Sequence, residues 1–189
     1  MSRTIKRQRG VSLVELIIFI VVVGVAVVGV VAAMRLGTAA STDPMIQKQA
    51  LAIAEALLEE VQLQPFTYCD PDDANAASAN NTAGCAVAAN NETLAIGPEG
   101  GETRAGAPLF DNVSDYHNLN LAGISGMDGA AIGGLANYAA IITITPQGLG
   151  VIPADEALLI RVTVSGPPGT NATVVLDGYR TRYAPNALP

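Results

Sequence analysis

The sequence predicts an α+β chain, in which a long N-terminal helix, half membrane-spanning and half amphipathic, packs on an antiparallel β-sheet head. Three observations predict this fold. Residues 16–34 carry no charge, residues 45–64 repeat apolar side chains at helical spacing, and residues 138–180 contain runs with strand character. These patterns separate helix from strand because side chains recur every ~3.6 residues on one helix face and every ~2 residues on one strand face.

Residues 16–34 are long enough to cross a membrane as a helix. At ~1.5 Å per residue they extend roughly 28 Å, close to the ~30 Å hydrocarbon core of a bilayer. Arg3, Lys6, Arg7 and Arg9 precede the run, and basic flanks stay on the cytoplasmic side. The remainder of the chain is therefore expected to face outward, first in the periplasm.

A cleaved secretory signal is the alternative interpretation of this segment. Such signals end in small residues after about 7–15 apolar residues, and Ala32-Ala33-Met34-Arg35 is a weak match to that cleavage pattern. The apolar run is longer than such a signal requires. We therefore expect residues 11–34 to stay attached as an anchor.

A more specific motif lies at the start of the apolar run. In Arg9-Gly10-Val11-Ser12-Leu13-Val14-Glu15, a glycine ends a short basic leader and a glutamate follows five positions later. This resembles the prepilin processing motif of type IV pilin-like proteins. The resemblance implies that a prepilin peptidase cuts between Gly10 and Val11, removes residues 1–10 and methylates the new amino terminus. Val11 departs from the Phe or Met that is more frequent at this position.

Glu15 lies within the apolar run, where a carboxylate is costly unless it has a partner. The resemblance supplies one, since the family's glutamate is thought to compensate the terminal amine of a neighbouring subunit and so to set the axial register in a filament. The alternative is that Glu15 lies near the membrane interface and reaches water by itself.

Residues 35–65 are expected to continue the helix. Gly37 and Pro44 weaken a helix locally, so we expect a bend or brief unwinding over residues 36–44. Beyond it, apolar residues at spacings of three and four define one helix face, which is to pack on the head. Pro65 is expected to end the helix.

The two cysteines, Cys69 and Cys85, are expected to form a disulfide, because the outward compartment oxidises thiols. A zinc site would need histidine ligands nearby. Thiol catalysis would need a base, and the single histidine, His117, lies far along the chain.

The loop between the cysteines is the one candidate for a cofactor, a calcium ion. Asp70, Asp72, Asp73 and Asn75 offer several oxygen ligands within six residues, and calcium prefers oxygen. The EF-hand spacing is absent, and the alternative is that the acidic loop is simply solvated. No other cofactor is expected.

The head, residues 66–189, is expected to contain three strands at residues 138–145, 158–165 and 172–180. Ile160, Val162 and Val164 alternate with polar residues, as in a sheet with one face in water. Turns at residues 146–153 and 166–169 favour an antiparallel meander packed on the helix.

Further segments resemble one group within the family, the MshD-type minor pilins of mannose-sensitive haemagglutinin (MSHA) pili. They are residues 49–60, Gln64-Pro65-Phe66, residues 110–119 and Gly178-Tyr179-Arg180-Thr181-Arg182-Tyr183. The resemblance implies the type IV pilin fold and a structural role in filament biogenesis, with adhesion at the cell surface. It also implies other pilins, inner-membrane assembly proteins and membrane lipid as partners.

Two other functions stay open, a type II secretion pseudopilin and a signal-anchored periplasmic binding module. An enzyme is not expected, since the sequence has one histidine, no recognisable nucleophile motif and no metal cluster. Loss of the four basic leader residues from the total of 10 would leave six basic residues against 17 acidic ones. Such a chain should repel nucleic acid.

Overall fold

A computed structural model describes residues 12–92 and 96–188, with the side chains of residues 35–43 left out. Contacts between residues divide the chain into two compact units, Met1–Pro44 and Met45–Pro189. The proposed cleavage site, Gly10 and Val11, lies outside the described residues.

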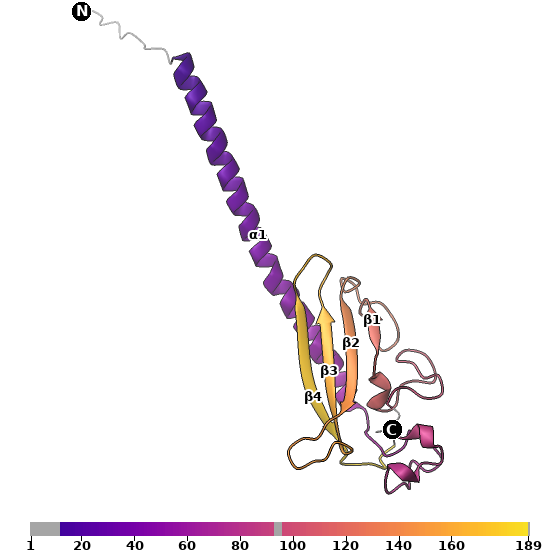
Figure 1. Ribbon diagram of the computed structural model, residues 1–189. Coiled ribbons are helices and arrows are strands. Elements are labelled where there is room, and N and C mark those ends of the chain that lie inside the picture. The colour runs from indigo at the N-terminus through magenta and orange to yellow at the C-terminus, as the bar shows by residue number, and fades with distance from the viewer. Residues whose placement is uncertain (1–11, 93–95, 189) are drawn as a thin grey trace, which may run out of the picture. The chain divides into compact units, whose positions relative to one another are not determined.

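Helix α1 comprises Leu13–Leu63 and passes from the first unit into the second (Figure 1). Its backbone is helical throughout residues 36–44, so the predicted unwinding is wrong. Pro44 lacks a single N–H donor, and the loss of one hydrogen bond does not end a helix whose neighbouring turns are intact. Alanines on the N-terminal side of this proline favour the helical backbone.

The first unit presents a continuous apolar surface. The segment Leu13–Met34 has a mean hydropathy of 3.2, and none of its most apolar window is buried. Its length and composition are sufficient to cross a membrane. An apolar helix surface without protein cover favours lipid or another apolar helix as its surroundings.

The second unit contains a four-stranded antiparallel sheet in the order β1-β2-β3-β4 (Figure 1). Its strands are β1 Asn120–Ala122, β2 Ala139–Pro146, β3 Ala157–Ser165 and β4 Thr173–Thr181. The predicted meander is confirmed, and its three strands lie within one residue of the predicted bounds. Strand β1, which pairs with the first three residues of β2, was not predicted.

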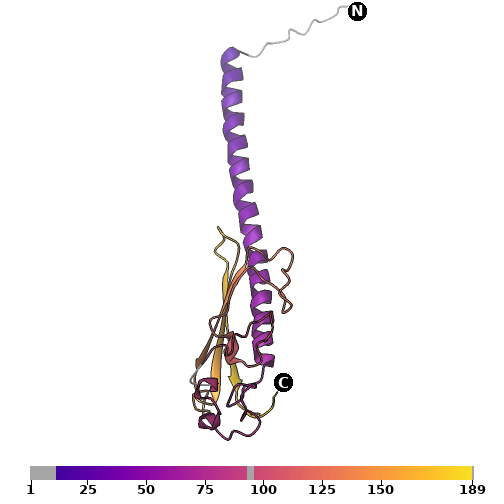
Figure 2. The same ribbon diagram turned by 90° about the vertical axis from the view of Figure 1, so that its right-hand side faces the viewer.

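The C-terminal part of α1 packs on one face of this sheet (Figure 2). Its apolar face shares one core with alternate residues of the central strands, as β3 shows by burying Ile160, Val162 and Val164 and exposing Arg161 and Ser165. The helix residues in this core are Ala50, Ile53, Ala54, Leu57 and Val61. The amphipathic pattern of residues 45–64 therefore indicates which face of the helix packs on the sheet, as well as the helix itself.

Within the described residues, three short 3₁₀ helices lie in the connections: Thr82–Gly84, Ala88–Asn90 and Ser114–Tyr116. The last belongs to the segment that packs beside the sheet. Val113 and Tyr116 are fully buried in the core, and the Phe110 ring meets the Tyr116 ring edge-on at 5.0 Å between centroids. This segment thus closes one end of the core.

Two side chains of the helix, Leu58 and Gln62, lie close to Gly178 in β4. A Cβ atom there would lie 2.6 Å from Gln62 Nε2 and 2.8 Å from Leu58 Cδ1. Gly178→Ala is therefore expected to lower the free energy of unfolding by no more than about 1 kcal/mol, since only the ends of two flexible side chains must shift. Chemical unfolding would measure this loss. Gly133→Ala is the control, because a Cβ there meets nothing within 4 Å; equal effects of the two changes would contradict the packing argument.

Candidate functional site

The N-terminal site combines the apolar surface of α1 with Glu15. This glutamate lies in the first turn of the helix and is exposed. A carboxylate at this end of a helix is favoured by the backbone N–H groups that have no partner there. Among the described residues, Glu15 therefore places a carboxylate at the start of the apolar surface of Leu13–Met34. This arrangement is suited to binding a cationic group on an apolar partner.

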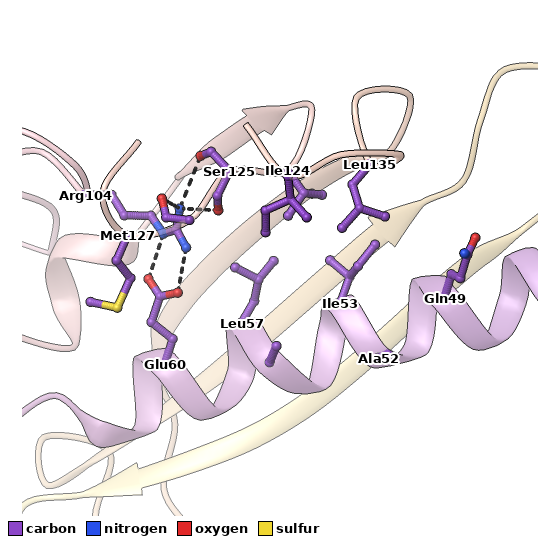
Figure 3. Close-up of a pocket in the computed structure, with 13 residues that line it drawn as sticks. Gln49, Ala52, Ile53, Leu57, Glu60, Arg104, Ile124, Ser125, Met127 and Leu135 are labelled. Atoms are coloured by element: carbon purple, nitrogen blue, oxygen red, sulfur yellow. Dashed lines mark hydrogen bonds and ion pairs between the residues drawn. The ribbon is translucent and has the colours of Figure 1, made fainter. Parts of the chain in front are cut away.

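The second unit has an apolar groove of about 440 Å³ between α1 and the segment before β2 (Figure 3). In Figure 3, Ile53 and Leu57 point from the helix toward Ile124 and Leu135 on the opposite wall. The lining that the structure describes holds no histidine or cysteine. It consists of Gln49, Ala52, Ile53, Ala56, Leu57, Glu60, Arg104, Ile124, Ser125, Gly126, Met127, Ile132 and Leu135. Such a groove can hold an apolar group but offers no nucleophile paired with a base.

A buried ion pair closes one end of the groove. The Arg104 guanidinium donates two hydrogen bonds of 2.7 Å to the carboxylate of Glu60. It also donates to the backbone carbonyls of Ser125 and Gly126, and the Tyr116 hydroxyl donates to Glu60 at 3.0 Å. This pair therefore links the helix to two segments that are distant in sequence.

The predicted disulfide between Cys69 and Cys85 is confirmed, with Cα atoms 5.5 Å apart. His117 lies elsewhere, and its Nδ1 accepts a hydrogen bond from the backbone N–H of Ile144 in β2. The histidine is thus engaged in holding a strand, which leaves the cysteine pair as a structural link.

Within the disulfide loop, Asp73 and Asn75 support the backbone. Asp73 accepts hydrogen bonds from the N–H groups of Asn75, Ala86 and Val87. Burial raises the pKa of this carboxyl, but these donors outweigh burial and hold the pKa below its usual value. The Asn75 amide donates to the carbonyl of Gly84. The carboxylate oxygens of Asp73 are therefore engaged within the loop, and the Asn75 side chain is held there through its Nδ2.

Asp70 and Asp72 instead join an acidic cluster with residues from outside the loop. Oxygen atoms of Asp70, Glu99 and Glu102 lie within 4.8 Å of one another, as do those of Asp72, Glu102 and Asp111. Sequence reasoning missed three of these five residues. The sequence Glu99-Gly100-Gly101-Glu102 could have indicated a turn that brings two carboxylates together. In the structure both glycines have positive φ, and the N–H of Glu102 donates a hydrogen bond to the carbonyl of Glu99.

The cluster is electrostatically strained. Burial first, and then repulsion by neighbouring carboxylates, raises the pKa of Glu99 and of Glu102 to about 8. The same causes raise the pKa of Asp111 to about 7. Two further acids lie nearby: Glu92 accepts a hydrogen bond from the Ser114 hydroxyl, and Asp115 accepts two from backbone N–H groups.

Comparison with known proteins finds a family model that matches the N-terminus of this chain. No curated protein and no solved structure matches it. Residues 5–31, however, match the model of the prokaryotic N-terminal methylation motif, and this segment includes Gly10, Val11 and Glu15. The chain therefore carries the processing and methylation motif of type IV pilins and pseudopilins, on an apolar helix that leads into a disulfide-bonded α+β unit.

Proposed function

We propose that this chain is a minor pilin of an MSHA-like type IV pilus, with a structural role in filament assembly and in adhesion at the cell surface. A prepilin peptidase removes residues 1–10 and methylates Val11. The protein then waits in the inner membrane as a single-pass subunit, with residues 66–189 in the periplasm. Assembly proteins extract it into the filament.

One observation carries this proposal: the methylation motif lies on a helix whose apolar side chains are uncovered. Residues 5–31 match the motif, and the large apolar side chains of Leu13–Met34 are exposed. A leader cut that leaves such a helix attached produces a subunit that exchanges lipid for neighbouring helices. In the filament, Glu15 compensates the methylated amine of the next subunit.

The site chemistry supports a structural subunit over an enzyme. Proteins with this motif are structural subunits, and in the described residues the single histidine holds a strand while both cysteines are joined. The acidic surface of the processed chain favours partners other than nucleic acid.

The proposal is tested by the intact mass of full-length protein, expressed with and without a prepilin peptidase. With the peptidase, the protein is expected to lose residues 1–10 and to gain one methyl group on Val11. Gly10→Val should remain uncut in the same cells, because it removes the glycine that ends the leader in the motif. An inactive peptidase serves as the control for other proteases.

Other cleavage products would assign the protein to another class. An uncut chain in the presence of active peptidase would contradict processing and favour a signal-anchored binding module. A cut near Ala33 would indicate a secreted protein. Correct processing followed by assembly only into a type II secretion filament would retain the subunit class and identify a pseudopilin.

A further inference from the structure

The acidic cluster contains buried oxygen atoms that no protein group satisfies. Asp70 is 2% exposed and Glu102 is 7% exposed, and one oxygen of each, Asp70 Oδ2 and Glu102 Oε2, has no hydrogen-bond partner. Glu99 Oε2 and Asp111 Oδ1 share this property. Buried polar atoms of native proteins nearly always have a partner, so four such oxygens in one cluster indicate an absent electropositive group.

No arginine or lysine supplies that group in the part of the chain that the structure describes. Arg104 is two residues from Glu102, but its guanidinium is engaged by Glu60 and by backbone carbonyls. Of the other arginines that the structure describes, Arg161 pairs with Asp177 and Arg182 pairs with Glu156. The carboxylates of the cluster therefore face one another without a cation from the protein.

The donor set identifies the class of cation. All five side chains offer carboxylate oxygen, which hard divalent cations prefer, whereas zinc sites use nitrogen and sulfur. Calcium accepts about six to eight oxygen ligands in irregular geometry, while magnesium requires a near-octahedral site and keeps several waters. A dense group of carboxylates from three separate segments matches calcium better.

We infer that Asp70, Asp72, Glu99, Glu102 and Asp111 bind calcium, with Glu102 shared by the two groups of three. The site differs from the one that the disulfide loop alone predicts, because Asp73 and Asn75 are replaced by residues from two other segments. Bound calcium joins the loop closed by Cys69 and Cys85 to the Glu99–Glu102 turn and to the segment that enters the core at Val113.

The cation also removes an electrostatic cost. Carboxylate oxygens that lie within 4.8 Å of one another repel when ionised, and a divalent charge among them offsets this repulsion. Outside the cell calcium modules commonly have dissociation constants on the order of 10⁻⁴–10⁻³ M. This expected range rests on the proposed outward location, whereas the site itself rests on the cluster geometry.

Calcium titration of the full-length chain in detergent, after removal of metal with a chelator, tests the inference. Isothermal titration is expected to show saturable calcium binding and weaker magnesium binding. Calcium should also raise the thermal unfolding midpoint, since it binds the folded state. Absence of saturable binding at millimolar calcium, or equal binding of magnesium, would overturn the assignment. None of these outcomes depends on leader processing, so this inference and the proposed function can fail separately.

Glu102→Gln separates metal binding from a merely structural role. The variant should bind calcium at least about tenfold more weakly, and calcium should no longer raise its unfolding midpoint. Without metal, its midpoint should stay close to that of the native chain, because glutamine keeps the shape and the polar character of the side chain. Glu99→Gln should behave in the same way and serves if the first variant does not fold.

Glu55→Gln provides the matched control, since it makes the same chemical change at an exposed position of α1. It should leave the calcium affinity and the calcium-dependent rise in midpoint unchanged. Native-like calcium binding by both Glu102→Gln and Glu99→Gln would contradict the proposed ligands.

Discussion

Arg104→Met is expected to lower the free energy of unfolding by about 3–5 kcal/mol, the usual result of leaving one member of a buried ion pair alone. The side chains of Arg104 and Glu60 are only 7% and 12% exposed. Removal of the guanidinium leaves the Glu60 carboxylate with the Tyr116 hydroxyl and without a cation. It also removes the guanidinium donor from the backbone carbonyls of Ser125 and Gly126, of which Gly126 keeps the hydrogen bond from the N–H of Gly129. Urea unfolding followed by tyrosine fluorescence would measure the loss, because the chain has 5 tyrosines and no tryptophan.

An exposed pair of the same geometry provides the control. Arg161 also donates two hydrogen bonds of 2.7 Å to a carboxylate, that of Asp177, but their side chains are 51% and 41% exposed. Arg161→Met should leave the unfolding midpoint nearly unchanged, since water replaces the lost partner. The double change Glu60→Leu with Arg104→Met should recover much of the lost stability. Equal losses from Arg104→Met and Arg161→Met would show that burial of the first pair has no energetic importance.

Glu15→Gln is expected to reduce incorporation into filaments by more than about tenfold while leaving leader cleavage unchanged. The expectation follows from the proposed function. Within a packed bundle of apolar helices, an amine without a partner carries a large desolvation penalty, and the loss of about 1.4 kcal/mol already corresponds to a factor of ten. Immunodetection in sheared filaments and in membranes of the native bacterium would give the incorporated fraction.

Glu55→Gln is the matched control for this experiment too, because it removes one carboxylate from the same helix outside the apolar segment. Its incorporation should equal that of the native chain. If Glu15→Gln were incorporated as well as the control, Glu15 would serve only to reach water at the membrane interface, and the proposed pairing with the amine would be wrong.

Local sequence patterns were sufficient for the main elements. The uncharged run predicts a helix because its composition and length both match a bilayer, and β3 was predictable because Ile160, Val162 and Val164 alternate with polar residues. Strand β1 was not predictable, since three residues are too few to show a period and their pairing with β2 depends on a distant segment. The expectation at Pro44 overestimated how strongly a proline disrupts a helix. The hydrogen bond that Pro44 cannot donate costs less free energy than the intact helical turns on either side contribute.

The acidic cluster is a feature that the sequence alone could not predict and that the tertiary structure created. The sequence by itself determined the leader motif, the apolar helix, the strand periods and the pairing of its two cysteines, since each is a property of neighbouring residues or of composition. Only tertiary structure decided that Asp70 and Asp72 meet Glu99, Glu102 and Asp111 while Asp73 is engaged by backbone donors. The physical reason is that carboxylates from separate segments interact through distance in space, and packing of the intervening loops sets that distance.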